Sequence, residues 1–308
     1  MTQAALPHMA PLQAIINALF SAGCLPVSAS SVQRARAVAD SFVPPLEDAD
    51  AWRVGEISIP GDPAIPALTV RPSEASRAVM VYFHGGGWVI GSPRNYAPFA
   101  IRLADATGCT IILPQYRLAP ETRFPGAVQD ALRALQWLDE AGMAELGLTG
   151  PLIVAGDSAG GNLAAVAAQH LADAMRIACQ VLIYPVVDSD LTRGSYERYA
   201  CGSILSAADM RWFWNAYTPD QAERVVPLAS PLRGPIARGL APAVMVAAEI
   251  DPLFDEGREY RKLLEFHGIP VARRVFAGMA HGFVPMIGLV DQSDEAISFI
   301  NEEISKFI

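Results

Sequence analysis

The sequence lacks an excess of positive charge. Its 308 residues hold 23 Lys and Arg against 32 Asp and Glu, which gives a net charge of −9. A chain of this sign repels polyphosphate backbones, so we expect no nucleic-acid partner.

Long apolar runs are absent too. No stretch approaches the roughly 18 apolar residues that a membrane-spanning helix requires, and we expect no integral membrane segment. Near the N-terminus, the apolar stretch 12–20 is interrupted by Gln13 and Asn17, and no Lys or Arg precedes it. This argues against a secretory signal and favours a cytoplasmic location.

The four cysteines, Cys24, Cys109, Cys179 and Cys201, form no CxxC motif. Cysteine pairs at that spacing are typical of zinc and redox sites. We therefore expect neither a metal nor an organic cofactor.

Hydrophobic residues make up 52% of the chain, enough to bury one sizeable core, and we expect residues 1–308 to form a single α/β domain. From about residue 50, short β-rich runs alternate with helical patterns, which predicts a mostly parallel sheet of about eight strands flanked by helices. The expected strands are 52–59, 67–71, 79–83, 110–113, 152–155, 181–184, 244–248 and 272–276. The clearest expected helices are 127–140, 159–175, 257–267 and 292–306.

Two segments do not follow this alternation. Residues 1–48 have an amphipathic helical pattern, and residues 188–226, which include an aromatic cluster at 212–217, separate two expected strands. Together they predict a helical cap. The aromatic cluster is typical of core packing, although a lid over an apolar pocket would use the same residues.

The segment Gly156–Gly160 reads G-x-S-x-G and joins an expected strand to an Ala-rich helix. A tight turn at such a junction exposes a serine, here Ser158, and leaves no room for side chains two residues before and after it. A serine hydroxyl needs a base and stabilisation of the oxyanion that its attack creates, and the helix beginning at Ala159 points its amides toward that charge. The alternative is a glycine-rich turn with a helix-capping serine.

A second glycine-rich segment, His84–Trp88, follows the expected strand 79–83. Consecutive glycine amides can form a concavity that binds an anion. Phosphate is the rival ligand, but neither the dinucleotide fingerprint nor a G-K-[ST] ending is present. A histidine at the start of such a loop is more often a brace for the loop than a catalytic base, so we assign His84 to support.

Of the five histidines, His281 occupies a loop after the strand 272–276, at the carboxyl end of the sheet where open α/β folds place their sites. We predict that it is the general base. The acidic partner should lie between the serine and the histidine and follow a strand, which favours Asp251. Asp255 and Glu249 are the alternatives, and Asp255 could instead cap the helix expected near Gly257.

With these residues in place, the sequence resembles the bacterial hormone-sensitive-lipase family (family IV) of esterases and lipases, within the α/β-hydrolase superfamily. The resemblance extends over essentially the whole chain. It rests on five segments in order: His84–Trp88, Tyr116–Glu121, Gly156–Gly161, Asp251–Leu253 and His281–Phe283.

The resemblance implies an α/β-hydrolase fold and a triad of Ser158, Asp251 and His281. It places an oxyanion hole at the amides of Gly86, Gly87 and Ala159, with Gly85 serving mainly the loop's conformation. It also implies a cap that shapes the substrate pocket, and we expect this pocket to be lined by Trp88, Trp212, Phe213 and Phe283.

The predicted activity is hydrolysis of small esters with short to medium acyl chains through an acyl-enzyme. The resemblance also suggests a homodimer that pairs through the last strand. Two other functions use the same fold: an amidase of the arylformamidase type, and a noncatalytic protein that binds a small ligand.

Overall fold

One eight-stranded sheet organises the chain in the computed structural model, which describes residues 26–41, 50, 53–200 and 204–308. The strand order is β1-β2-β4-β3-β5-β6-β7-β8. The pairs β1–β2 and β2–β4 are antiparallel, whereas all pairs from β4 to β8 are parallel. The strands are β1 (Val54–Ile59), β2 (Ile65–Val70), β3 (Ala78–Phe83), β4 (Cys109–Pro114), β5 (Leu152–Asp157), β6 (Cys179–Ile183), β7 (Ala243–Ile250) and β8 (Val271–Ala280).

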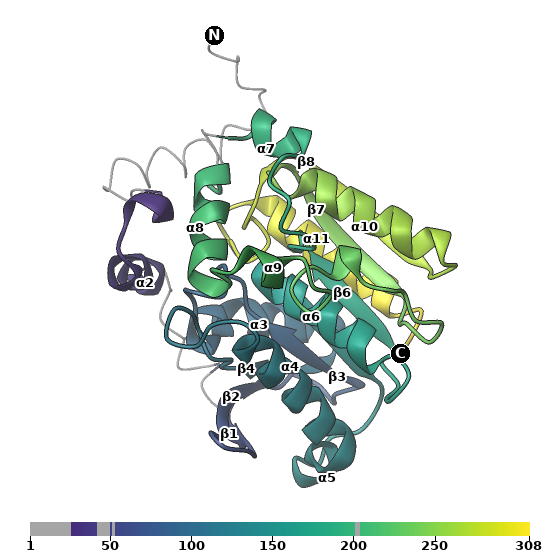
Figure 1. Cartoon of the computed structure of the whole chain (residues 1–308). Helices are drawn as coiled ribbons and strands as arrows, with labels where there is room; N and C mark the ends of the chain where they lie inside the picture. Colours follow the sequence, from purple (N-terminus) through teal and green to yellow (C-terminus); the bar gives the residue numbers. More distant parts are fainter. Residues whose placement is uncertain (1–25, 42–49, 51–52, 201–203) are drawn as a thin grey trace.

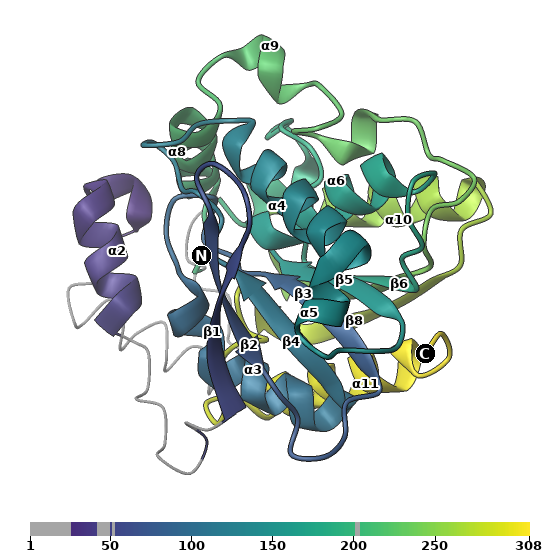
Figure 2. The same ribbon diagram turned by 90° about the horizontal axis from the view of Figure 1, so that it is seen from below.

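Helices cover both faces of this sheet (Figure 2). The long helices are α3 (Pro93–Thr107), α4 (Gly126–Trp137), α6 (Ala159–Leu171), α10 (Phe254–Phe266) and α11 (Asp291–Ile304). The shorter ones are η2 (Val27–Ala29), α2 (Val32–Ser41), η4 (Leu138–Gly142), α5 (Met143–Glu145), α7 (Gly194–Arg198), α8 (Ala207–Tyr217), α9 (Gln221–Arg224) and η5 (Pro231–Arg233).

Two hydrophobic clusters form the core, one on each face. The cluster that includes α4, α6 and α10 also holds the buried residues of α8, and the cluster on the other face joins α3 to α11. The central strands β3, β4, β5 and β6 are buried at every position. Continuous burial explains why these strands read as uninterrupted apolar runs rather than as alternating ones.

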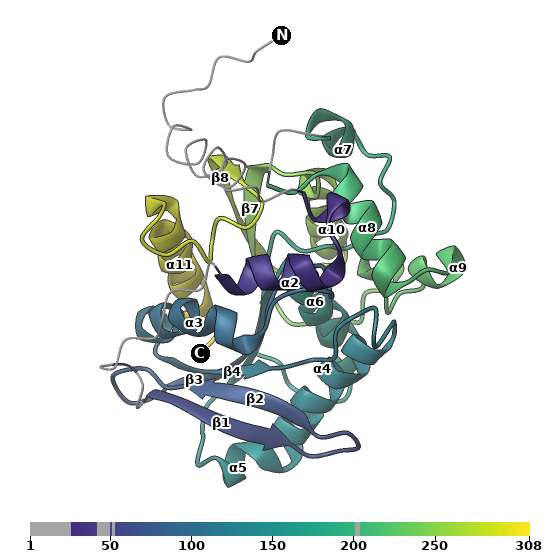
Figure 3. The ribbon, with the colours of Figure 1, turned by 90° about the vertical axis from the view of Figure 1, so that its left-hand side faces the viewer.

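The described part of the predicted cap consists of α2 with η2 and of the segment that carries α7, α8 and α9. Figures 1 and 3 show α2 and α8 on the same side of the molecule, beside the body of the sheet. The amide of Ser28 donates to Asp209 Oδ1 at 2.9 Å, which ties η2 to α8. The expected helices before residue 26, the stretch 12–20, Cys24, Cys201 and the strand start at Trp52 lie outside the described residues.

Two predicted boundaries were wrong in ways that affect the site. β8 continues to Ala280, so residues 277–280 belong to a strand that pairs with β7 through a register shift, and His281 follows the strand directly. Helix α10 begins at Phe254, so Asp255 lies inside its first turn and is not its N-cap. Among the helices of the described residues, none is both long and apolar enough to cross a membrane.

Candidate active site

Ser158 lies at the junction of β5 and α6, with φ of 55° and ψ of −119°. A positive φ is strained for a residue with a side chain, and such strain is concentrated at functional sites. A Cβ at Gly156 would collide with the carbonyl of Gly160, and one at Gly160 with the carbonyl of Phe83. The two glycines therefore let the turn close against β3 and leave Ser158 at its tip.

A chain of hydrogen bonds joins three side chains from distant parts of the sequence. Ser158 Oγ lies 2.8 Å from His281 Nε2, and His281 Nδ1 lies 2.7 Å from Asp251 Oδ2. Since a carboxylate only accepts, Nδ1 carries the proton toward Asp251, and Nε2 is left to accept from the serine hydroxyl. All three side chains are buried, with Ser158 8% and His281 7% exposed.

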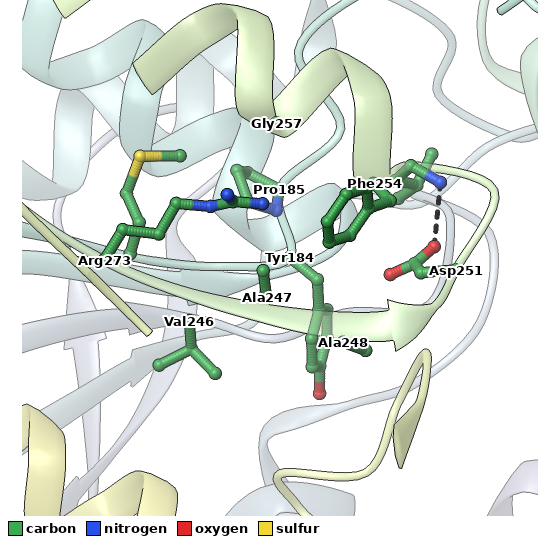
Figure 4. A pocket seen from close by; sticks show the side chains of 11 residues that line it. Tyr184, Pro185, Val246, Ala247, Ala248, Asp251, Phe254, Gly257 and Arg273 are labelled. Carbon is green, nitrogen blue, oxygen red and sulfur yellow. Dashed lines mark hydrogen bonds between the residues drawn. The ribbon is translucent and has the colours of Figure 1, made fainter. Parts of the chain in front are cut away.

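Asp251 is held by its own turn. Its Oδ1 accepts the amide of Leu253 at 2.8 Å, the contact that the dashed line at Asp251 marks in Figure 4. This leaves Oδ2 for the histidine. The two alternative acids have other partners: Asp255 Oδ2 accepts the amide of Ser195, and Glu249 Oε2 accepts the amide of Gly278. Of the three candidates, Asp251 is the one bonded to His281.

The glycine-rich loop follows β3, the strand that pairs with β5 in the register Phe83 to Gly156. This pairing sets the loop beside the turn of Ser158. Gly86 and Gly87 have φ of 111° and 59°, and the carbonyl of Gly86 accepts the amides of Val89 and Ile90. Within the described residues, no acceptor is found for the amides of Gly86, Gly87 and Ala159.

Asp157 joins the serine turn to the glycine-rich loop. Its Oδ1 accepts the amide of Gly85 and the hydroxyl of Tyr82, both at 2.9 Å, and its Oδ2 accepts the hydroxyl of Tyr96 at 2.8 Å. Burial raises the pKa of Asp157 to about 6, while the hydrogen bonds from Tyr96, Tyr82 and the amide of Gly85 oppose the rise. The amide of Gly85 is thus engaged inside the protein, and its role in the loop's conformation stays a prediction.

His84 contacts the loop and not the serine. Its Nδ1 lies 2.7 Å from the carbonyl of Gly85, its ring stacks on Tyr116 at 4.4 Å, and its carbonyl accepts the Tyr116 hydroxyl. Burial lowers the pKa of His84 to about 4, so the ring is neutral near neutral pH and Nδ1 donates to Gly85. These contacts fit a supporting role for this histidine.

The four aromatic residues expected in the substrate pocket have different surroundings. Phe213 lies directly against Gly87, where its ring occupies the space that a Cβ would fill, and Trp212 packs edge-on against Phe213. Trp88 is fully buried and stacks on Tyr217 of α8, whereas Phe283 is fully buried between Tyr184 and Phe276. Their assignment to the pocket stays a prediction.

Two cavities lined by described residues lie near the candidate active site. The hollow behind Asp251, bordered by Phe254 and Arg273 (Figure 4), measures about 10 Å³, which is hardly enough for one water molecule. A cavity of about 620 Å³ opens beside the glycine-rich loop and touches Gly282. Among the described residues, no cluster of His, Cys, Asp or Glu side chains could hold a metal ion.

The sequence reasoning missed several tyrosines that shape the site. Tyr82 and Tyr96 bind Asp157, and the ring of Tyr184 lies 4.6 Å from that of His281. Tyr184 follows β6 with φ of 33°. The available signal was positional: Tyr82 precedes the glycine-rich loop by two residues, and Tyr184 ends the expected strand 181–184.

Comparison with known proteins identifies related chains. The family model described as alpha/beta hydrolase fold matches residues 80–285. An ethyl acetate hydrolase from Pseudomonas putida is 38% identical over 252 residues, which cover 79% of each protein. The carboxylic ester hydrolase LipN from Mycobacterium tuberculosis is 34% identical over 88% of this chain and 75% of its own. The crystal structure of a thermostable esterase from Pseudomonas putida ECU1011 superposes with a TM-score of 0.89, at 32% identity, over 100% of this chain and 98% of that one.

Proposed function

The chain belongs to the α/β-hydrolase fold family and is a carboxylic ester hydrolase of the bacterial hormone-sensitive-lipase type, and we propose that it cleaves small esters through an acyl-enzyme on Ser158. The observation that carries the proposal is the hydrogen-bonded chain from Ser158 Oγ through His281 to Asp251. The two relatives described above are ester hydrolases, which favours an esterase over an amidase or a noncatalytic binding protein.

In the first step, Ser158 Oγ attacks the ester carbonyl carbon and its proton passes to His281 Nε2. The carbonyl π electrons move to the oxygen, where the amides of Gly86, Gly87 and Ala159 would stabilise the negative charge. Asp251 accepts the hydrogen bond from Nδ1 and stabilises the imidazolium that forms. The intermediate then collapses, the bond to the alcohol oxygen breaks, and the alcohol leaves with the proton from Nε2.

In the second step, water replaces the alcohol. His281 Nε2 takes a proton from the water as the water oxygen attacks the acyl carbon. The second tetrahedral intermediate then collapses: the bond from the acyl carbon to Ser158 Oγ breaks, the carboxylic acid leaves, and the proton passes from Nε2 to Ser158 Oγ. The side chains and amides named here supply all the acid-base and electrostatic chemistry of this cycle. No metal or organic cofactor takes part in it.

The edge of β8 that faces away from β7 is relevant to the predicted homodimer. β8 pairs with β7, and within the described residues no strand covers its other edge. An open edge can pair with a second copy of the chain. The homodimer through this strand remains a prediction.

The cytoplasmic location also remains a prediction. The partner that the proposed mechanism requires is a small-molecule ester.

The direct test is hydrolysis of p-nitrophenyl butyrate by Ser158→Ala. Because the variant lacks the nucleophile, we expect kcat to fall by several powers of ten, on the order of 10⁴ or more. Ser298→Ala, which removes an exposed serine hydroxyl from α11, serves as the matched control and should keep the wild-type rate. Wild-type turnover by Ser158→Ala would refute the assignment.

A further inference from the structure

The cavity of about 620 Å³ has four walls from separate parts of the chain. They are α2, the loop of residues 85–91, α3, and the segment 282–289 that follows β8. Figure 3 shows α2 passing above α3. The cavity therefore lies between the described N-terminal helix of the cap and the α3 face of the sheet.

This cavity begins at the edge of the candidate active site. Its lining includes Gly85 and Gly86 of the glycine-rich loop and Gly282, the residue after His281. In an ester whose carbonyl oxygen faces the amides of Gly86 and Gly87, two groups extend from the carbonyl carbon: the acyl arm and the alcohol arm. One of these arms can enter the cavity between the loop and Gly282.

The lining favours an uncharged group. Of the described residues that border the cavity, none carries a formal charge. The polar side chains of α3 are already engaged: Asn95 donates to Asp40 and accepts from Ser92, and Tyr96 donates to Asp157 while accepting from Gly85. A charged arm would lose its hydration without gaining a partner.

Besides Ser41, whose hydroxyl donates to the carbonyl of Val38, and four glycines, the rest of the lining is apolar, with side chains such as Ile90, Phe99, Met286 and Leu289. The volume lies within the range of roughly 300–1,000 Å³ typical of pockets that enclose drug-sized ligands. A methyl or ethyl group would leave most of this space unfilled. We infer that the cavity binds one arm of the ester and that this arm is a bulky, uncharged hydrocarbon group; this inference rests on the proposed function.

The test fills the cavity from α2. Ala39 lines it and is half-buried, whereas Ala37 lies exposed on the same helix, so Ala39→Trp and Ala37→Trp form a matched pair. The substrates are 2-naphthylmethyl acetate, with a bulky alcohol arm, ethyl 2-naphthylacetate, with a bulky acyl arm, and ethyl acetate. For at least one naphthyl ester, we expect the wild-type kcat/KM to exceed that for ethyl acetate by about tenfold or more.

Ala39→Trp should lower kcat/KM for that naphthyl ester by about tenfold or more and keep kcat/KM for ethyl acetate within about twofold of the wild-type value. Ala37→Trp should change kcat/KM for neither ester. The ester that is affected identifies the arm that the cavity holds. If Ala39→Trp does not fold, Leu289→Trp, at an exposed position that also lines the cavity, makes the same test. An equal effect on all three esters, no effect on any, or no wild-type preference for a naphthyl ester would overturn the inference.

Failure of the cavity inference is separable from failure of the proposed function. If Ser158→Ala abolishes ethyl acetate hydrolysis while the tryptophan in the cavity changes nothing, the esterase mechanism stands and the cavity assignment falls. If Ser158→Ala retains hydrolysis of ethyl acetate, the proposed function itself falls.

Discussion

Asp157 is the residue through which the serine turn and the glycine-rich loop hold each other in place. It is buried, precedes Ser158 directly, and accepts hydrogen bonds from Gly85, Tyr82 and Tyr96. The Gly85 amide also lies 3.1 Å from the Tyr96 hydroxyl, so two acceptors fix the start of the loop. Because Gly86 follows directly, the direction of its amide depends on these contacts.

We predict that Asp157→Asn lowers kcat for p-nitrophenyl butyrate by about tenfold, because displaced amides stabilise the oxyanion less well. KM should change by less than about threefold, since the loss falls on the transition state. Tyr96→Phe should have a smaller effect of the same kind. Asp173→Asn, at an exposed carboxylate, is the control, and an unchanged kcat in Asp157→Asn would contradict this role.

Each residue of the proposed triad carries a local signal in the sequence. Ser158 stands in a glycine-framed turn, and Asp251 and His281 each follow a strand at the same edge of the sheet. Tyr96 gives no such signal: it reaches Asp157 across 61 residues of sequence, from a helix that was not among the clearest expectations. Contacts of this kind depend on how α3 packs, which residue types and spacing do not specify.

At the scale of the helices and strands, all eight expected strands are present, with boundaries that differ by a few residues. Helix α3 was not among the clearest expectations, and its sequence contains Pro93 and Pro98, which favour breaks over helix interiors. In the structure, Pro93 occupies the first turn, where no amide donor is needed, and Ser92 caps the helix by accepting the amide of Asn95. The local propensity was therefore overridden by capping and by the packing of α3 on the sheet.

The junction of α10 with the cap contains a buried carboxylate. Glu256 accepts the amides of Val187 and Asp188 and the hydroxyl of Tyr196. Burial raises the pKa of Glu256 from 4.5 to about 8, although these donors and the charge of Arg193 oppose the rise. The pKa is higher in the folded state, so protonation of Glu256 stabilises the fold.

This contribution is fully present below about pH 4.5 and is lost as the pH rises through about 8. Glu256→Gln resembles the protonated form and does not titrate. We therefore predict that the free energy of unfolding of the variant, relative to wild type, increases between pH 5 and pH 8, by an amount on the order of a few kcal/mol. Urea unfolding at several pH values measures it, with the exposed Glu302→Gln as control, and a pH-independent difference would contradict the shift.

At the scale of the whole molecule, the sheet order brings together what the sequence separates. The loops after β3, β5, β7 and β8 meet at the carboxyl edge of the parallel strands, where folds of this type place their sites. That edge could be predicted from strand alternation alone. The cavity could not, because its walls come from α2, α3 and the segment after β8, and their mutual distances follow only from the packed fold.

The described residues cover part of the predicted cap. The region 188–226 contains α7, α8 and α9, and α8 places Phe213 against Gly87. For the first cap segment, 1–48, the described residues include α2 and η2. The prediction of a single domain over residues 1–308 is consistent with the one continuous sheet and stays a prediction.

In the proposed mechanism, the fold makes one serine hydroxyl nucleophilic by bringing a distant histidine to it. Labelling with a fluorophosphonate, followed by peptide mass spectrometry, measures this activation, because the reagent forms a covalent bond with an activated serine. We predict a single labelled site at Ser158 in the wild type, and labelling at least about a hundredfold slower in His281→Ala. Labelling at another serine, or an equal rate without the imidazole of His281, would contradict it.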